Sequence, residues 1–191
     1  MGLYIDGIPI VDKNAYDFDW EGVSRATMLH GPQGTLYGRN AMSGVLSLST
    51  ISPYDDYQPT VNVEYGTSNT VRAGVSLTAG NSALSATFRH TDGYHTNVFK
   101  NSLCDPYDGL ALRWKWMSIC NERLSLTNIL SANISREGGF AYGLWKDGTQ
   151  HPVYYNDEGS YRRVSVIEGF RMRRHGDILI TDATASLQLR D

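Results

Sequence analysis

The sequence predicts an all-β protein, and three observations support this prediction. From residue 60 onward, apolar and polar side chains alternate with the period of two that is typical of strands with one apolar face. The chain contains 19 Gly, 12 Tyr and 4 Trp, a composition that suits many turns and half-buried strands. No stretch approaches 18 consecutive apolar residues, so we expect no transmembrane helix, whereas alternating strands could still cross a membrane.

The first 52 residues predict a separate, smaller β unit. Leu3–Ile10 reads as a strand, an Asp-Gly turn and a short return strand. Residues 14–22 carry three acids among aromatic side chains and predict a polar loop or a short helical turn. Val23–Leu29 predicts a strand that leads into Gly31–Thr50, where closely spaced glycines predict a tight loop that opens into another strand.

Residues 53–59 contain two prolines and two acids and predict a linker. After this linker, residues 60–191 predict about seven antiparallel strands of about ten residues each. The alternating segments are 61–65, 71–79, 84–89, 110–116, 124–134, 163–172 and 179–189.

The lengths of the connections distinguish a membrane barrel from a soluble sandwich. If the first of the seven strands rises from the inner side of the membrane, both long connections, 92–109 and 136–160, fall outside and the inner turns are short. Outer-membrane barrels sort their loops in this way, whereas a sandwich has no reason to do so. The sequence therefore predicts part of an antiparallel transmembrane β-barrel that is incomplete.

The same topology predicts two free thiols. Cys104 falls in an outer loop and Cys120 in an inner turn. The two would lie on the order of 25 Å apart, far beyond the roughly 7 Å between Cα atoms that a disulfide allows.

Charge and motif content exclude several function classes. A net charge of −3 gives no basic face for nucleic acid. Asp17 and Asp19 lie in a loop without an apolar pocket, no Ser–His–Asp arrangement stands out, and we expect neither an enzyme nor a cofactor site. His90, Asp92 and His95 are close enough to suggest a metal site, but a polar loop at the end of a strand is the favoured interpretation.

Two further clusters have alternative interpretations. Trp114 and Trp116 share a face near the inner end of their strand, which favours an aromatic girdle at the membrane boundary over a ligand pocket, although a core position also fits. A basic cluster is favoured as a solvated inner turn over an anion-binding site, and its members are Arg171, Arg173, Arg174 and His175.

The glycine-rich segment is the most specific motif of the chain. It is not a phosphate-binding loop, because Gly38 is followed by Arg39 and Asn40 rather than by Lys and Ser or Thr. The residues of this motif are Gly31, Pro32, Gln33, Gly34, Thr35, Leu36, Tyr37, Gly38, Arg39, Asn40 and Gly44. Together with Ala41 and Val45, they resemble the segment that ends the plug domain of TonB-dependent outer-membrane receptors.

Other segments extend this resemblance over most of the chain. Tyr4–Pro9 resembles a plug strand of that family, and Tyr155–Asp157 with Ser160–Arg163 resembles an outer loop and the strand after it. Within the family, the chain resembles the siderophore and iron type more than the glycan-importing branch. The resemblance is also Bacteroidetes-like. The chain departs from the family pattern at three positions: Thr27, His30 and Ser43 stand where the family usually has Glu, Arg and Gly, respectively.

The resemblance implies an architecture and a function. Residues 1–52 would be the C-terminal part of the plug, 53–59 a linker, and 60–191 the first strands of a barrel of 22 strands. The parent protein would sit in the outer-membrane lipid of a Gram-negative cell and take up a ferric siderophore or a similar large ligand, driven by the TonB energy-coupling complex. The glycine motif would then have a structural and gating role, and the ligand-binding residues stay unknown.

Three expectations concern the chain as a whole. Residues 1–6 lack the features of a signal peptide, Met1 falls inside a plug strand, and the contact box for the energy-coupling complex is absent. Seven strands cannot close a barrel, so we expect a fragment that is not competent alone. The alternative is a small self-contained β-rich binding or adhesion module at the cell surface, which would be a water-soluble monomer. An enzyme would need an acid–base cluster in a pocket.

Overall fold

The computed structural model describes residues 1–191 except 12–18, 39–40, 140, 144, 147 and 158. Nearly all the regular structure of the described residues is β-strand. None of the described helices has the length and apolar character needed to cross a membrane. The predicted loop at 14–22 lies largely outside the described residues.

A four-stranded sheet and one turn of helix form the N-terminal unit, which we call the small sheet. Its strand order is β2-β1-β4-β3, with β1 antiparallel to β2 and parallel to β4. Asp6 and Gly7 join β1 to β2 with φ of 50° and 83°, the positive values that a two-residue hairpin turn requires. The elements are β1 (Gly2–Ile5), β2 (Ile8–Ile10), β3 (Val23–His30), α1 (Gly34–Tyr37) and β4 (Gly44–Thr50).

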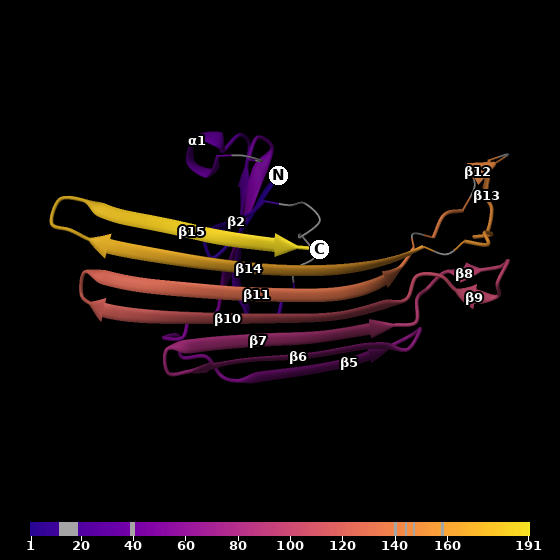
Figure 1. Ribbon diagram of the computed structural model, residues 1–191, viewed down its shortest axis with the longest axis horizontal. Coiled ribbons are helices and arrows are strands. Elements are labelled where there is room, and N and C mark those ends of the chain that lie inside the picture. Colours follow the sequence, from indigo (N-terminus) through magenta and orange to yellow (C-terminus); the bar gives the residue numbers. More distant parts are fainter. Residues whose placement is uncertain (12–18, 39–40, 140, 144, 147, 158) are drawn as a thin grey trace.

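A seven-stranded antiparallel sheet forms the rest of the chain, and we call it the wall. Its order is β5-β6-β7-β10-β11-β14-β15, so each strand of the wall pairs with the next wall strand along the chain (Figure 1). All seven predicted strands are confirmed. Their bounds are β5 (Thr60–Gly66), β6 (Thr70–Ala79), β7 (Ser82–Thr91), β10 (Tyr107–Asn121), β11 (Leu124–Gly138), β14 (Ser160–His175) and β15 (Ile180–Arg190).

The connections are sorted by length between the two ends of the wall. The long segments after β7 and β11 lie at one end, and short turns join the strands at the other (Figure 1). Each long segment carries a small hairpin of two-residue strands. These strands are β8 (Thr96–Asn97), β9 (Ser102–Leu103), β12 (Trp145–Lys146) and β13 (Thr149–Gln150).

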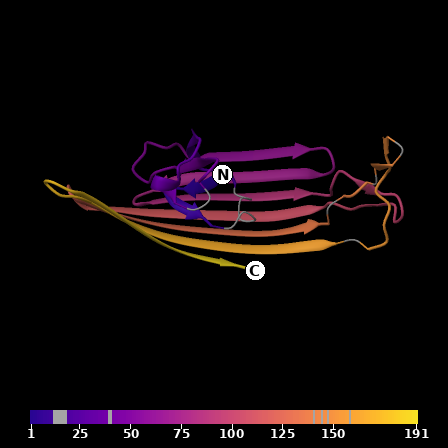
Figure 2. The ribbon, with the colours of Figure 1, turned by 90° about the horizontal axis from the view of Figure 1, so that it is seen from above.

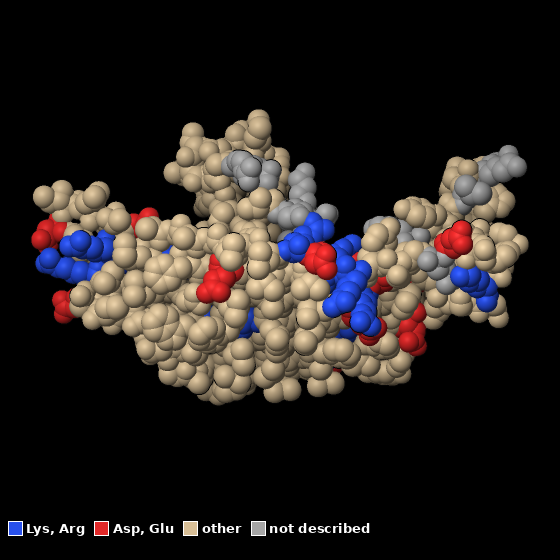
Figure 3. Space-filling model, viewed as in Figure 1, with Lys and Arg blue, Asp and Glu red and all other residues tan. Residues whose placement is uncertain are grey.

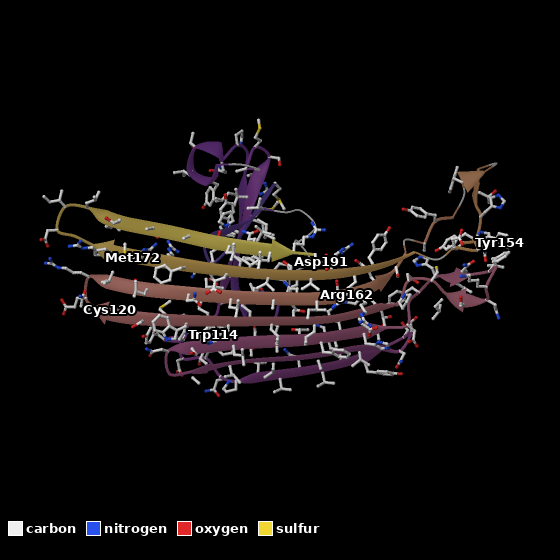
Figure 4. All side chains as sticks on the ribbon, viewed as in Figure 1. Trp114, Cys120, Tyr154, Arg162, Met172 and Asp191 are labelled. Atoms are coloured by element: carbon white, nitrogen blue, oxygen red, sulfur yellow. The ribbon has the colours of Figure 1, made fainter. Side chains whose placement is uncertain are left out.

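Both cysteines are free, which confirms the prediction of two thiols. Cys104 is buried in the long connection before β10. The prediction that Cys120 lies in an inner turn is wrong in detail, because β10 continues to Asn121 and the turn is formed by Glu122 and Arg123. Figure 4 shows Cys120 at the short-turn end of the wall.

The two faces of the wall differ in polarity. On the outer face, Val61, Val63 and Tyr65 are 72%, 74% and 76% exposed. On the opposite face, where the N-terminal unit lies (Figure 2), polar side chains such as Ser76 and Ser85 are buried beside Glu21 and Gly22. This is the reverse of a soluble protein, in which apolar residues are covered and polar residues face solvent. It is the arrangement of a strand wall whose outer face contacts lipid.

One polar pair interrupts the apolar outer face. Glu168 lies on this face in the middle of β14, and its carboxylate accepts a 3.0 Å hydrogen bond from the side-chain amide of Asn128 on β11. This pair explains why the alternation of β14 weakens beyond Val166 in the sequence.

Apolar contacts between the two sheets are concentrated at one place. Ile129 and Ile167 of the wall join a cluster of buried small-sheet residues, which are Leu3, Ile5, Ile8, Ile10 and Leu48. Gly169 lies beside this cluster, where an added Cβ would stand 1.8 Å from Cδ1 of Ile8. The wall therefore needs a residue without a side chain where β2 approaches it most closely.

The prediction that the basic cluster forms a turn is wrong, because β14 continues to His175, although Arg173, Arg174 and His175 are exposed. The guanidinium groups of Arg171 and Arg173 both donate hydrogen bonds to Asp182 of β15, Arg171 from Nε at 2.8 Å and Arg173 from Nη2 at 2.8 Å. The carboxylate offsets much of the repulsion between the two cations, so the pair belongs to the strand-to-strand contact of β14 and β15.

The substitution Gly169→Ala tests the close approach of β2 to the wall. The new methyl group would overlap Ile8, and we expect the free energy of unfolding to fall by about 1–3 kcal/mol. Urea unfolding of the detergent-solubilised protein, followed by tryptophan fluorescence, measures this change. Gly66→Ala is the matched control, because its Cβ would approach only Thr70, at 3.8 Å. Equal losses for the two variants would contradict the close approach.

Candidate functional site

A buried ion pair fastens the hairpin turn of the small sheet to the wall. Nζ of Lys115, on β10, lies 2.9 Å from Oδ1 of Asp6, and the two side chains are 7% and 10% exposed. The ammonium also donates to the backbone carbonyls of Thr50 and Ile51, at 3.2 Å and 3.3 Å. Asp6 in turn accepts bonds from the backbone N–H and the hydroxyl of Thr50. Both buried charges are thus paired and hydrogen-bonded.

A second contact holds the segment that precedes β3. The guanidinium of Arg113, also on β10, donates to the backbone carbonyls of Glu21 and Asp19, at 3.1 Å and 3.2 Å. Lys115 and Arg113 are alternate residues of one strand, so both point toward the small sheet. In this buried interface, Lys115 thus binds backbone carbonyls at the end of β4, and Arg113 binds those just before β3.

Arg113 thereby holds Glu21 against the wall, where the carboxylate of Glu21 is buried. It accepts hydrogen bonds from the Ser76 hydroxyl, at 2.9 Å, and from the Asn62 side-chain amide, at 3.1 Å. Gly74 of β6 makes room for it, because a Cβ there would stand 2.5 Å from Oε2 of Glu21. Sequence reasoning missed Glu21, Arg113 and Lys115, since nothing in their local pattern shows that an inner face meets a second sheet.

A hollow of about 690 Å³ opens between the small sheet and the wall, at the end that carries the long connections. The Arg89 guanidinium lies 5.3 Å from the ring centroid of Tyr107, and Arg72 is 3.4 Å from the carboxylate of Asp19. Cations beside aromatic rings suit a large ligand with anionic or aromatic groups. The charged, titratable or aromatic lining residues are Asp19, Trp20, Glu64, Arg72, Arg89, His90, Tyr94, Asp105 and Tyr107.

A carboxylate organises the loop at the mouth of this hollow. Asp105 accepts bonds from the backbone N–H groups of Tyr94 and His95, each at 2.9 Å, and from Nδ1 of His95, at 2.8 Å. Burial acts to raise the pKa of Asp105, but the hydrogen bonds from His95 and Tyr94 outweigh it and the pKa is lowered. The pKa of Tyr94 is lowered as well, by hydrogen bonds with Thr70 and Thr91.

The histidines considered as metal ligands have different partners. His95 pairs with Asp105, whereas His90 pairs with Asp108 at 2.7 Å and with Asp92 at 3.3 Å. Within the described part of the chain, no three His, Cys, Asp or Glu side chains gather as metal ligands would.

Asn97 joins the two long connections, a role that sequence reasoning did not find. Its fully buried side chain donates a 2.8 Å bond to the carbonyl of Tyr155 and accepts one from the backbone N–H of Phe99. Val98 bonds to Val153 through the backbone. The two connections therefore form one structural unit at this end of the wall, where Figure 4 labels Tyr154.

The glycine motif lies apart from the hollow. Gly31, Gly38 and Gly44 have φ of 82°, 65° and 134°, and a Cβ on Gly44 would stand 2.6 Å from the carbonyl oxygen of Leu29. The sequence prediction of a tight loop that opens into a strand is confirmed, with α1 inside the loop. Leu36 is 82% exposed.

Other motif residues have local roles. Tyr37 packs edge to face against Tyr4, with ring centroids 4.9 Å apart, and its carbonyl accepts a hydrogen bond from the Tyr4 hydroxyl. The backbone N–H of Gln33 closes the loop by bonding to the carbonyl of Ala41 at 2.8 Å. Arg39 and Asn40 lie outside the described residues.

Comparison with known proteins points to one family. Residues 1–45 match the model of the TonB-dependent Receptor Plug Domain. The pesticin receptor of Yersinia enterocolitica is 37% identical over 67 residues, which are 35% of this chain and 10% of that protein. The pesticin receptor of Yersinia pestis matches equally.

Solved structures show the same fold. The ferric yersiniabactin uptake receptor FyuA from Yersinia pestis superposes with a TM-score of 0.76 at 20% identity, over 99% of this chain and 32% of that one. The ferric-catecholate import receptor Fiu from E. coli K12, in an open form, gives a TM-score of 0.73 at 15% identity, over 98% and 31%.

These matches support a TonB-dependent receptor of the Gram-negative outer membrane. They also confirm the predicted fold class, a partial plug followed by part of an antiparallel barrel. The chain spans about a tenth of the curated relatives and about a third of the solved structures that it matches.

Replacement of Lys115 by Met tests the buried ion pair. The substitution leaves the Asp6 carboxylate buried without its cation, and we expect a loss of about 3–5 kcal/mol in the free energy of unfolding. Asp6→Asn in the same chain should restore part of this loss. Arg123→Met is the matched control, because its 2.8 Å pair with Asp177 is exposed and worth less than about 1 kcal/mol. Similar losses at the two sites, measured by urea unfolding, would contradict the role of Lys115.

Acidification tests the Asp105 contact. Because its pKa is lowered in the folded loop, the carboxylate stabilises the loop fully above its usual pKa of 3.8 and stops doing so as the pH falls through the lower, folded value. We expect the amide proton resonances of Tyr94 and His95 to shift with a midpoint below 3.8. Asp105→Asn should remove this titration, and a midpoint above 3.8 in the unmodified protein would contradict the contact.

Proposed function

We propose that this chain is the plug end and the first barrel strands of a receptor that imports a ferric siderophore or a similar large ligand. Residues 1–52 are the C-terminal part of the plug, 53–59 the linker, and 60–191 the first strands of the barrel. In this proposal the receptor is of the siderophore and iron type. A Bacteroidetes-like origin stays a prediction, since the relatives named above come from other bacteria.

The hollow at the long-loop end is the observation that supports this proposal. Plug residues Asp19 and Trp20 and wall residues of β6, β7 and β10 line it together, so a bound ligand would contact both parts at once. Ferric siderophores are bulky chelates with oxygen donors and are often anionic. Arg89 has no ion-pair partner among the described residues and is therefore available to such a ligand.

The gating role follows from how the plug is held. Charged contacts from Lys115 and Arg113 attach its edge to the wall, and few apolar residues of the wall join its core. Polar contacts can be exchanged for water at little net cost, whereas an apolar interface cannot. A pull by the energy-coupling complex on the plug would then release these contacts. The glycine motif shapes the β3–β4 hairpin that such a pull would have to move.

The exposed outer face of the wall argues against a water-soluble adhesion module. Such a module would present apolar side chains such as Val61 and Val63 to water over a broad area. As a transport component, the chain would perform no chemistry, and in this proposal it is not an enzyme.

Uptake of radioactive iron as ferric siderophore tests the proposal in cells that carry variants of the chromosomal gene. Deletion of the gene should abolish uptake of at least one siderophore. Arg89→Gln should weaken binding of that siderophore by about tenfold, the loss of about one charge-assisted hydrogen bond. Unchanged uptake of every ferric siderophore tested after deletion would contradict the function.

Gly44→Ala separates gating from binding. The methyl group would strain a φ of 134° and collide with the carbonyl of Leu29, so we expect reduced uptake with siderophore binding retained. Gly34→Ala is the matched control, because nothing lies within 4 Å of its Cβ position. Equal uptake by the two variants would contradict a role for Gly44 in gating.

A further inference from the structure

Two arginines lie directly opposite each other on the outer face of the wall. Arg136 of β11 and Arg162 of β14 are register partners, and both side chains are exposed. Arg162 stands near the long-loop end of β14 (Figure 4). Like charges at directly opposite positions of neighbouring strands repel each other, so this pair destabilises the wall unless an anion lies between them.

Two acids near the pair, among the residues that the structure describes, have other partners. Asp108 of β10 is the register partner of Arg136, but its carboxylate lies 2.7 Å from Nδ1 of His90. Glu137 points to the inner face, where it lies 2.6 Å from Nη1 of Arg163. In the described part of the chain, neither Arg136 nor Arg162 has an ion-pair partner.

The arginine pair sits at the border of the apolar outer face. The next outward row toward the membrane consists only of apolar residues, namely Phe88, Leu110, Ile134 and Val164. Along β14 the outward positions stay uncharged, apart from Glu168, until Arg174 at the other end. That length of strand is about 40 Å, or about 30 Å along the membrane normal at a tilt of about 40°, which matches a bilayer core.

Charged side chains gather toward the ends of this face, and the band between them is mostly uncharged (Figure 3). Arg136 and Arg162 also line a hollow of about 550 Å³, whose other charged lining residues are Asp108 and Glu137, the acids that pair with His90 and Arg163. In the orientation that the connection lengths predict, with the long connections outside, the hollow lies at the depth of the outer-leaflet headgroups.

We propose that Arg136 and Arg162 bind the phosphate of a lipid headgroup in the outer leaflet. Planar guanidinium groups bind phosphate oxygens through paired hydrogen bonds, and a phosphate between them would offset their mutual repulsion. The acyl chains of the same lipid would lie on Ile134 and Val164, one row deeper. The outer leaflet of a Gram-negative cell is built largely of lipid A, a glycolipid that carries phosphates, and this is the occupant that we assign.

Binding of lipid A to the protein purified from outer membranes in dodecyl maltoside tests the assignment. The shift of the thermal unfolding midpoint is titrated with diphosphorylated lipid A, with dephosphorylated lipid A and with inorganic phosphate. We expect the diphosphorylated lipid to bind at least about tenfold more tightly than the dephosphorylated one, and Arg136→Gln with Arg162→Gln to remove this difference. Arg136→Lys with Arg162→Lys keeps the charges and should retain part of it.

Arg174→Gln is the matched control, because Arg174 is exposed on the same face of β14, at the other end. It should leave lipid A binding unchanged. Equal binding of both lipids by the unmodified protein, or the same loss in the Arg174 variant, would overturn the proposal. A midpoint shift of the same size with inorganic phosphate would overturn the assignment to a lipid, because the site would then recognise free phosphate.

Discussion

The ammonium of Lys115 and the carboxylate of Asp6, buried 2.9 Å apart, illustrate the main constraint on this structure, which is that buried polar groups need partners. The inner face of the wall is polar, so anything packed against it must satisfy hydrogen bonds rather than only exclude water. The N-terminal unit meets this requirement with the carboxylates of Asp6 and Glu21 and with buried backbone carbonyls next to β3 and β4. Lys115, Arg113 and Ser76 find partners there, and each contact would be costly if only one side were present.

The same constraint separates the two interfaces of the wall. On the face toward lipid, transfer of the apolar side chains out of water is favourable. The charged residues of this face lie mainly at its borders, as Arg136 and Arg162 do. Toward the small sheet, polar contacts from Lys115, Arg113 and Ser76 hold the N-terminal unit. Among the described residues, the inner interface becomes apolar around Ile129 and Ile167, where Gly169 leaves room for Ile8. One chain therefore builds a wall with an apolar outer face and a polar inner face.

The long connections extend this design to the outside. Asp105 orders the chain beside the mouth of the hollow, and Asn97 ties one connection to the other. The cations of the hollow are held by neighbours of different kinds: Arg72 by Asp19, and Arg89 by the ring of Tyr107.

The sequence by itself determined the local structure. Strict alternation predicted all seven wall strands, the Asp6-Gly7 pair predicted the first hairpin, and the glycines at 31–44 predicted the loop and its family, because each depends on neighbours in the chain. Only the tertiary structure decided which polar residues are buried. In the sequence, Glu21, Arg113 and Lys115 look like ordinary inner-face or loop residues. In the structure, Glu21 packs against Gly74 and Lys115 pairs with Asp6, both of which come from distant segments. Burial and pairing depend on how two sheets pack, and no local pattern records that.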